Sequence, residues 1–210
     1  MYSQSAFKQD DTAELYQLIQ DYSFGELILQ SPDGLHIHHL PFVLDEDKGC
    51  LYAHVAKGNP EWQAFQNGQE VTCVFKGENA YISPSWYASK EEHHKVVPTW
   101  NFRVVHVNGK CTLHDDTEWL VHHLDQLTYK HEHHREVPWS IHDAPTDFIQ
   151  QLSKAIMGIE IKIESMQGKW KLGQNKPLSD IQGVIAGLSA EPNPLANKLA
   201  DETARYIALK

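Results

Sequence analysis

The spacing of apolar residues changes from helical to strand-like within the first part of the chain. Residues 11–22 begin with a capping-box pair, Asp11 and Glu14, and their apolar side chains then recur at helical intervals. This pattern predicts a first helix. Residues 24–29 and 35–44 carry strand-like patterns on either side of the turn sequence Ser-Pro-Asp-Gly, which predicts a β-hairpin.

Short β patterns dominate the middle of the chain, interrupted by a short helix that is predicted to begin at Asn59-Pro60. A second hairpin is predicted farther on, because residues 100–107 and 110–114 lie on either side of Asn108-Gly109. Asn-Gly between two strand-like runs is typical of a two-residue turn. The other predicted strands of this region are residues 50–55, 71–75 and 80–83.

Helical spacing returns beyond residue 115. Asp115 and Glu118 repeat the capping-box spacing at the start of a helix that reaches the 130s, and residues 146–157 are predicted to form another. Residues 159–163 alternate strictly between isoleucine and charged side chains, which predicts a half-buried antiparallel strand. The tail, from residue 178 on, is predicted to be helical.

The order of these elements predicts a mainly β fold, a β-barrel with peripheral helices, and does not suit a parallel α/β sheet. No repeat, low-complexity tract or flexible linker interrupts the pattern. Residues 1–210 are therefore predicted to form a single domain with helical C-terminal additions. A chain of 210 residues can bury a sizeable core without disulfides or a structural metal.

Acidic residues outnumber basic ones, 28 to 18, which gives a formal net charge of −10. Such a chain repels nucleic-acid phosphates unless positive charge is gathered locally, so direct DNA binding is doubtful. No apolar run approaches the roughly 18 residues of a membrane-spanning helix, and the first residues lack the features of an export signal. The odd number of cysteines, without CxxC spacing, favours reduced thiols, so we expect a cytoplasmic protein.

The signatures GxGxxG, GxxxxGK[ST] and GxSxG are absent, which removes the main anchors for dinucleotide, P-loop and α/β-hydrolase enzymes. The 14 histidines suggest metal ligands instead. His36 and His38 share one face of a predicted strand that also carries His39, and residues 131–134 hold a second group. An HExxH zinc motif would need a histidine where the chain has Arg135. No matching acidic ligand set is evident, so no metal site is predicted, and the second group is interpreted as a solvated helix end.

Residues 80–109 hold a dense aromatic segment with Tyr81, Trp86, Tyr87 and Trp100. A loop-rich stretch of this kind can supply a ring-sized slot for an aromatic ligand. The alternative is a barrel lid that is packed by its own aromatic side chains. Composition alone does not decide between the two.

Residues 168–175 place Lys169 and Lys171 on one face if the segment is extended, with the amides of Gln174 and Asn175 just beyond. Cations suit a phosphate, and amides suit a ring that both donates and accepts hydrogen bonds. The alternative is a set of exposed charges on an edge strand.

Five segments lie in order along nearly the whole chain: HHLPFVLD at 38–45, HVAKGNPEW at 54–62, AYISPSWY at 80–87, HHKVVPTWNF at 93–102 and GKWKLGQN at 168–175. Together they resemble the PaiB-type FMN-binding negative transcriptional regulators. The resemblance implies the split β-barrel of the pyridoxamine-phosphate-oxidase-like flavoproteins, a homodimer, and FMN at the subunit interface.

By position in these segments, the resemblance implies that Lys57 meets the FMN phosphate. It also implies a strand along the flavin, residues that border the site, and a segment that closes it from the other subunit. His38 stands where the family is expected to have a threonine, which weakens any hydroxyl contact there. The strand residues are His38, His39, Leu40 and Pro41; the bordering residues are Ser83, Ser85, Trp86 and Tyr87; the closing residues are Lys169, Trp170, Lys171, Gln174 and Asn175.

The family name implies regulation of transcription, yet the sequence contains neither a helix-turn-helix pattern nor a basic stripe. Regulation is therefore expected to act through or alongside the flavin. Two alternatives stay open: a flavin-dependent oxidoreductase acting on a small molecule, and a haem-binding split barrel that uses some of the histidines.

Overall fold

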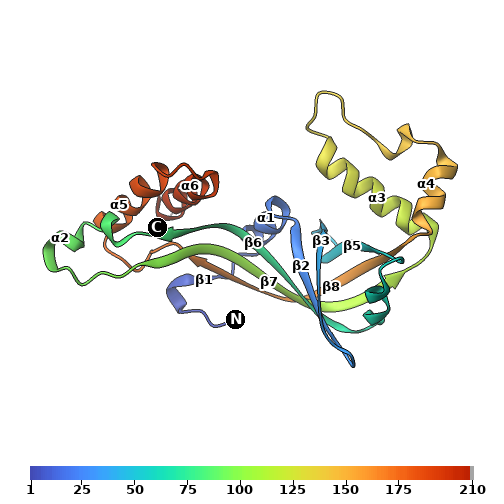
Figure 1. Ribbon diagram of the computed structural model, residues 1–210, viewed down its shortest axis with the longest axis horizontal. Coiled ribbons are helices and arrows are strands. Elements are labelled where there is room, and N and C mark those ends of the chain that lie inside the picture. The colour runs from blue at the N-terminus through green and yellow to red at the C-terminus, as the bar shows by residue number, and fades with distance from the viewer. Residues whose placement is uncertain (209–210) are drawn as a thin grey trace. The chain divides into compact units, whose positions relative to one another are not determined.

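The computed structural model describes residues 1–208, and its helices and strands fall into two compact units (Figure 1). The barrel unit consists of Tyr16–Phe75 and His106–Met166, and the ribbon unit consists of Met1–Leu15, Lys76–Val105 and the chain from Gln167 onward. The prediction of a single domain over residues 1–210 stays a prediction, and its last two residues lie outside the described part.

The barrel unit contains the strands β2 (Phe24–Ser31), β3 (Gly34–Pro41), β4 (Val43–Asp45) and β5 (Cys50–Ala56), together with parts of β6 (Glu70–Ile82), β7 (Thr99–His114) and β8 (Ile156–Lys171). Their order in the sheet is β3-β2-β6-β7-β8-β5-β4. β2 and β3 form the predicted antiparallel hairpin, and β5 runs antiparallel to β8. β3 also contacts β5, although the two lie near opposite ends of this order. The sheet therefore curls back on itself, as a barrel does.

The alternation of side chains along the strands directs one row into the core of the barrel unit. Ile159 and Ile161 are fully buried, whereas Lys162 is exposed, as the pattern predicted. The first predicted helix is α1 (Thr12–Asp21), and its Leu18 and Ile19 are also fully buried. Helical and strand periodicity thus identified the correct buried faces.

The predicted helices α3 (Thr117–Glu132) and η2 (Pro60–Ala64, a 3₁₀-helix) are both present. The α3 N-cap is Asp116, whose carboxylate accepts a hydrogen bond from the Trp119 amide at 2.8 Å. Asp115, the first residue of the predicted capping box, lies outside the helix. Asn59 caps η2 by accepting from the Glu61 amide at 3.1 Å.

The helix predicted over residues 146–157 is shorter than expected. In the structure α4 spans Thr146–Ser153, and β8 begins at Ile156. Ile156 and Met157 already pair with the end of β5, where they lie opposite Ala56 and Val55. Their apolar side chains fit either spacing, and the ladder to β5 decides the outcome. A short 3₁₀-helix, η4 (Ile141–Asp143), precedes α4.

The hairpin predicted at Asn108-Gly109 is wrong, because β7 passes through both residues without a break. A type I′ turn needs positive φ at both central residues, and neither residue has it. A Cβ at Gly109 would instead collide with the backbone carbonyl of Lys162 on the neighbouring strand β8. The Asn108 amide oxygen accepts a hydrogen bond from the Thr72 hydroxyl at 2.8 Å. The pair therefore marks a close approach between strands.

The separate strands predicted at residues 71–75 and 80–83 are likewise a single strand, β6. The polar residues between them resemble a turn in sequence, but Glu78 is buried there. Its carboxylate accepts two hydrogen bonds from the Arg103 guanidinium on β7, at 2.7 and 2.9 Å. An ion pair with the next strand explains why a charged residue continues the strand.

The ribbon unit contains the remaining parts of β6, β7 and β8 and the short strand β1 (Lys8–Gln9), which pairs antiparallel with β8. Its helices are η1 (Ser5–Phe7), η3 (Pro84–Trp86), α2 (Ser89–His93), α5 (Leu178–Ser189) and α6 (Pro194–Ala208). The last two are the helices predicted for the tail, and α5 packs against both α6 and η3 (Figure 1). The core of this unit includes Trp170, Leu188 and Leu199, all buried.

Within residues 1–208, no helix combines the length and the apolar character needed to cross a membrane. Cys50, Cys73 and Cys111 are buried and unpaired, in agreement with the expectation of free thiols. Burial raises the pKa of Cys73 and raises that of Cys111 to about 12, so these thiols are unreactive at neutral pH.

Candidate functional site

The four strand residues expected along the flavin do not share one face of β3. The His38 side chain is buried and packs against Phe65, with 4.9 Å between ring centroids, whereas His39 is exposed on the opposite face. There the His39 ring stacks with Phe24, with centroids 6.4 Å apart. Burial lowers the pKa of His38, which leaves its imidazole neutral at pH 7. Only one of the two histidines can therefore line a given surface of this strand.

Lys57 follows β5, and a hydrogen bond of 2.8 Å from its backbone amide to the Ala155 carbonyl fixes its place. Its ammonium group donates to the Asp115 carboxylate and to the Lys154 carbonyl, the latter at 3.2 Å. The Lys57 side chain is 25% exposed and that of Asp115 is 63% exposed. The cation is thus at the surface, but a carboxylate already neutralises part of its charge. The sequence pattern had assigned Asp115 to a helix cap and gave no sign of this pairing.

The residues of the aromatic segment are built into the ribbon unit. The Ser83 hydroxyl caps η3 by accepting from the Ser85 amide at 3.2 Å. Trp86 packs directly on α5, at positions where the helix carries glycine. Tyr87 is buried, which raises the pKa of its hydroxyl, and the Lys176 ammonium lies 4.7 Å from the centre of its ring. Of the two interpretations of the aromatic segment, the structure favours a lid packed by its own side chains over an open slot for a ligand. Only Ser85 among the four predicted residues is exposed.

At the end of β8, the two lysines and the tryptophan lie on opposite faces, because successive side chains of a strand point to opposite sides. Lys169 and Lys171 lie on one face, as predicted, and Trp170 is fully buried on the other. The Lys171 ammonium donates to the Thr99 hydroxyl and to the Trp100 carbonyl, the latter at 2.9 Å. Burial lowers the pKa of Lys171, and the nearby charge of Lys169 lowers it further.

The loop after β8 uses one of its two amides for its own structure. Gln174 accepts from the Leu172 amide at 2.8 Å and donates to the Trp170 carbonyl at 2.6 Å. This pair of bonds fixes the turn at Gly173, which has a φ of +81°. Asn175 is exposed. Of the two amides, only that of Asn175 is available to a ligand without breaking the turn.

The structure therefore sorts the predicted site residues into two sets. The barrel unit holds His38, His39, Leu40, Pro41 and Lys57, and the ribbon unit holds the other nine. Within the ribbon unit, the contact between Lys176 and Tyr87 brings the loop after β8 next to η3. The segments expected to border and to close the site are thus neighbours.

The sequence did not reveal a histidine pair in the barrel unit, in which His123 is buried and His54 is half-buried. His54 Nδ1 lies 3.0 Å from His123 Nε2, and burial, together with the charge that His54 would carry, lowers the pKa of His123 to about 3. His123 borders a cavity of about 260 Å³. The two residues lie on a strand and a helix far apart in the sequence, and no local pattern relates them. The cavity is lined by Lys48, Tyr52, Trp119, His122, His123, Gln126 and Glu160.

Comparison with known proteins gives the family and the fold. Residues 1–165 match the family described as "Putative FMN-binding domain". The chain is 34% identical over 203 residues to the "Protease synthase and sporulation protein PAI 2" of Bacillus subtilis (strain 168), covering 96% of this chain and 95% of that protein. The predicted resemblance to PaiB-type proteins is therefore confirmed.

Two solved structures share the fold at low sequence identity. The FAD and heme binding protein of Mycobacterium smegmatis is 14% identical, with a TM-score of 0.61 over 86% of this chain and 80% of that one. A conserved hypothetical protein of Mycobacterium tuberculosis is 12% identical, with a TM-score of 0.59 over 84% of this chain and 94% of that one. The chain thus belongs to the "Putative FMN-binding domain" family and is a split-barrel protein of the PaiB type, mainly β with peripheral helices.

Proposed function

We propose that the protein binds FMN and regulates transcription through or alongside the bound flavin. The match of residues 1–165 to a family described as FMN-binding carries the first part of this proposal. The name of the Bacillus subtilis relative, which refers to protease synthase and sporulation, supports the second part. When bound, the flavin would supply reversible electron transfer, while the protein supplies binding and orientation.

The side chains of the predicted site are of the types that FMN needs. The phosphate needs cations, which Lys57, Lys169 and Lys171 offer at positions accessible to solvent at least in part. The ring system needs flat contacts and hydrogen bonds, for which the exposed His39 and the amide of Asn175 are suited. Trp86, Tyr87, Trp170 and Gln174 would instead hold the contacting segments in place.

The test is a titration of flavin-free protein with FMN, followed by flavin fluorescence and by the visible spectrum. Saturation at about one flavin per subunit at micromolar protein is expected, and its absence would contradict the proposal. A Soret band in the protein as purified would favour the haem alternative. Steady turnover of a small-molecule substrate by the bound flavin would favour the oxidoreductase alternative.

Direct DNA binding is expected to be weak and strongly dependent on salt. The formal net charge of −10 opposes approach to a phosphate backbone, and few counterions can be released by scattered cations. An electrophoretic shift assay over a range of salt concentrations tests this expectation. Sequence-selective binding that survives physiological salt would make the protein a direct regulator.

We also propose a homodimer and a cytoplasmic location. The outer face of the β2–β3 hairpin exposes apolar side chains that a second copy of the chain would cover: Phe24 is 69% exposed and Leu35 62%. Ile37, on the same face as Leu35, is also exposed. Light scattering should give twice the monomer mass for the natural protein, and Ile37→Lys should shift it towards the monomer. The three unpaired thiols suit a reducing compartment.

A further inference from the structure

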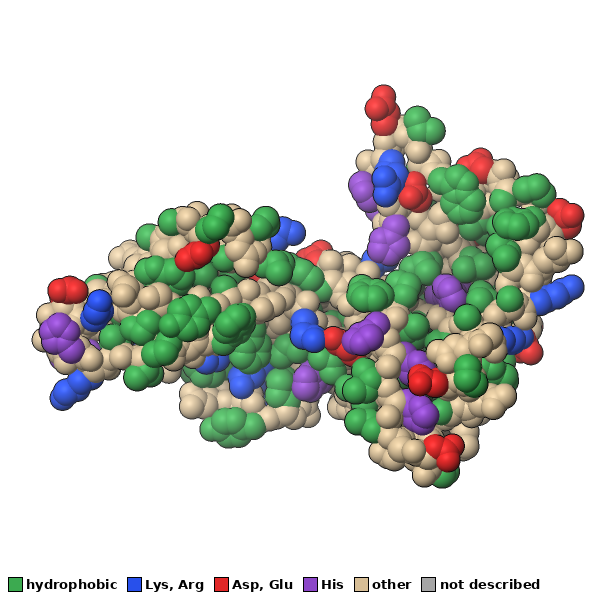
Figure 2. Space-filling view, viewed as in Figure 1, with side chains coloured by type: hydrophobic (Ala, Val, Ile, Leu, Met, Phe, Trp, Pro, Cys, Tyr) green, Lys and Arg blue, Asp and Glu red, His purple; other side chains and the backbone are tan. Residues whose placement is uncertain are grey.

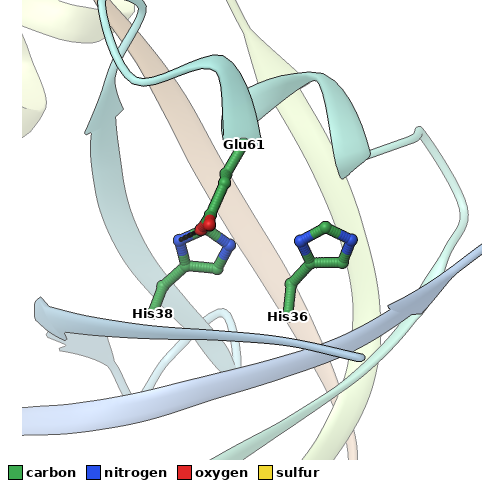
Figure 3. A group of neighbouring side chains, drawn as sticks. All are labelled: His36, His38 and Glu61. Carbon is green, nitrogen blue, oxygen red and sulfur yellow. Dashed lines mark ion pairs between the residues drawn. The ribbon is translucent and has the colours of Figure 1, made fainter. Parts of the chain in front are cut away.

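Two histidines and a glutamate of the barrel unit come together between β3 and η2 (Figure 3). His36 and His38 lie on the same face of β3 because they are two residues apart on a strand. Their rings are nearly parallel, with 7° between the ring planes and 6.4 Å between centroids. Glu61 reaches them from η2, and one potential ligand atom from each of the three residues lies within 4.8 Å of the others.

His38 has a ring nitrogen that the protein leaves without a hydrogen bond. Its Nδ1 lies 3.8 Å from a Glu61 carboxylate oxygen, and its Nε2 is buried with no hydrogen-bond partner within the described residues. The His38 side chain is only 5% exposed. Buried polar atoms in native proteins are nearly always satisfied, so this nitrogen points to a missing partner. Figure 3 shows the His38 ring with one nitrogen turned towards His36.

In most metal-binding histidines, the ring nitrogen that does not bind the metal makes a hydrogen bond, and His36 has such a bond. Its Nε2 lies 2.8 Å from the Ser31 hydroxyl oxygen, and that oxygen also accepts from the Asp33 amide at 3.1 Å. When His36 Nε2–H donates to Ser31, the lone pair is on Nδ1. A hydrogen bond of this type fixes the tautomer and the ring orientation of a metal ligand.

We propose that His36, His38 and Glu61 form a binding site for a divalent transition-metal ion, with Zn²⁺ the best-matched ion. Two imidazoles and one carboxylate are a ligand set that Zn²⁺ accepts, with a water molecule in the fourth position. Glu61 is more than half exposed, which leaves room for that water. Tetrahedral ligands lie about 3.3 Å apart at zinc bond lengths, so the three groups must move closer. The exposed Glu61 side chain, on a short 3₁₀-helix, can make most of that movement.

The sequence places His36 and His38 on one face of a strand but does not predict the site, because the acidic ligand comes from another element. The histidines at 131–134 do not form a comparable group: His131, His133 and His134 are exposed, and His133 Nδ1 already lies 2.9 Å from the Tyr129 carbonyl oxygen. All histidines except His93 and His94 belong to the barrel unit, and Figure 2 shows several at its surface. Any test must therefore separate this site from weak surface binding.

The test uses the full chain after a chelator has removed any bound metal, and it consists of two titrations. Zn²⁺ is titrated in competition with a chromophoric chelator, and Co²⁺ is titrated while its visible absorption is followed. One tight site per chain is expected, with a Co²⁺ spectrum of four- or five-coordinate type, and Mg²⁺ should not compete because it prefers oxygen ligands.

Glu61→Gln and His36→Gln should each weaken Zn²⁺ at least tenfold, and Ser31→Ala should weaken it by about 10- to 100-fold. Glu61 is exposed, so its replacement should not unfold the chain. A thermal melt provides the second readout, since Zn²⁺ should raise the Tm of the natural protein but not that of Glu61→Gln.

The matched controls are His39→Ala, on the other face of the same strand, and a triple variant with alanine at 131, 133 and 134. Both should keep the tight site. The proposal is overturned if the natural protein binds Zn²⁺ only weakly, or if tight binding survives Glu61→Gln and His36→Gln but is lost in the triple variant. None of these readouts depends on FMN, so the outcome is independent of the proposed function.

Discussion

At the scale of single residues, the contact between Lys57 and Asp115 affects how available the Lys57 ammonium group is to a ligand. The family resemblance implies that its ammonium group would meet a phosphate, whereas in the structure this group donates to the carboxylate of Asp115. Because both groups are partly exposed, solvent screens this ion pair, and its contribution to stability is small. An incoming phosphate would therefore displace Asp115 at little cost.

We expect Lys57→Ala to weaken FMN binding by about 1.5–3 kcal/mol, the range for a hydrogen bond to a charged group, and to leave riboflavin binding nearly unchanged. Riboflavin lacks the phosphate, so the contrast between the two ligands isolates the charge. Asp115→Asn should change FMN binding in the opposite direction, because it removes a competing anion. Fluorescence titrations measure both effects, and equal losses for FMN and riboflavin would assign Lys57 to the fold or the ring.

His123 is a buried base that must stay neutral in the folded protein. Its pKa is about 3 in the folded state against an ordinary value of 6.5, mainly because burial penalises the charged form. Between these two values the unfolded chain binds more protons than the folded chain. Stability is therefore fully present above about pH 6.5 and decreases as the pH falls below it. Burial lowers the pKa of His54 as well, so its contribution has the same sign.

We expect the free energy of unfolding to fall below pH 6.5 with a slope that approaches ~1.4 kcal/mol per pH unit for each such histidine. His123→Gln should flatten this slope, since glutamine keeps an amide near Nε2 but does not titrate. His131→Gln, at an exposed position near the end of the same helix, is the control and should change the slope far less. Urea denaturation at neutral pH and at about pH 5 measures the difference, and an unchanged slope in His123→Gln would refute the assignment.

At the scale of elements, α5 shows that a helix can depend on residues that are poor helix formers. Gly183 and Gly187 are four residues apart and therefore lie on one face of the helix. A Cβ at Gly183 would collide with the Trp86 carbonyl, and one at Gly187 would collide with the Trp86 ring. The two glycines let η3 approach the helix closely, which holds the segment Ser83–Tyr87 in place.

Gly187→Ala should destabilise the protein by about 1–3 kcal/mol, the usual range for overpacking. In an exposed helix the same change stabilises by up to ~1 kcal/mol, so even the sign of the effect is diagnostic. In a Trp86→Ala background, where the ring is gone, Gly187→Ala should become neutral or stabilising. Gln182→Ala, on the exposed side of α5, is the control for helix propensity. Thermal or urea melts of the natural protein, the two single variants and the double variant measure the coupling, and equal effects of Gly187→Ala in both backgrounds would contradict the prediction.

At the scale of the whole molecule, the two sets of predicted flavin residues belong to different compact units. Neither set alone offers both a cluster of cations and an open surface for a ring. The resemblance implies a dimer with composite sites, and a symmetric dimer would then carry two identical ones. This arrangement stays a proposal, and mixed dimers can test it.

The mixed dimer combines one chain that carries Lys57→Ala with one that carries Lys169→Ala and Lys171→Ala. If each site draws on both subunits, both lesions fall in one site of the heterodimer and the other site is intact. Unfolding and refolding the two variants together should then restore tight FMN binding to about half of the heterodimer's sites. Failure of this rescue, with heterodimers shown to be present, would mean that a single chain supplies each site.

Local spacing in the sequence was enough to predict α1, α3, the β2–β3 hairpin and the tail helices. Each of these depends on contacts between residues a few positions apart, or on one apolar face that any core would bury. The family resemblance is also a property of the sequence, since short segments in a fixed order carry it. The fold class followed from both.

Only the tertiary structure decided the features that depend on distant partners. Asn108-Gly109 continues a strand because the carbonyl of Lys162 lies against Gly109, and Glu78 extends β6 because Arg103 faces it. The pairing of Lys57 with Asp115, and the position of Glu61 over His36 and His38, join segments that no local pattern relates. The preference of a residue for helix, strand or turn contributes about 1 kcal/mol or less to the free energy of folding. A steric collision, an unpaired buried charge or an unsatisfied buried nitrogen costs more than that. The larger energies come from contacts across the fold, so they override the local signal wherever the two disagree.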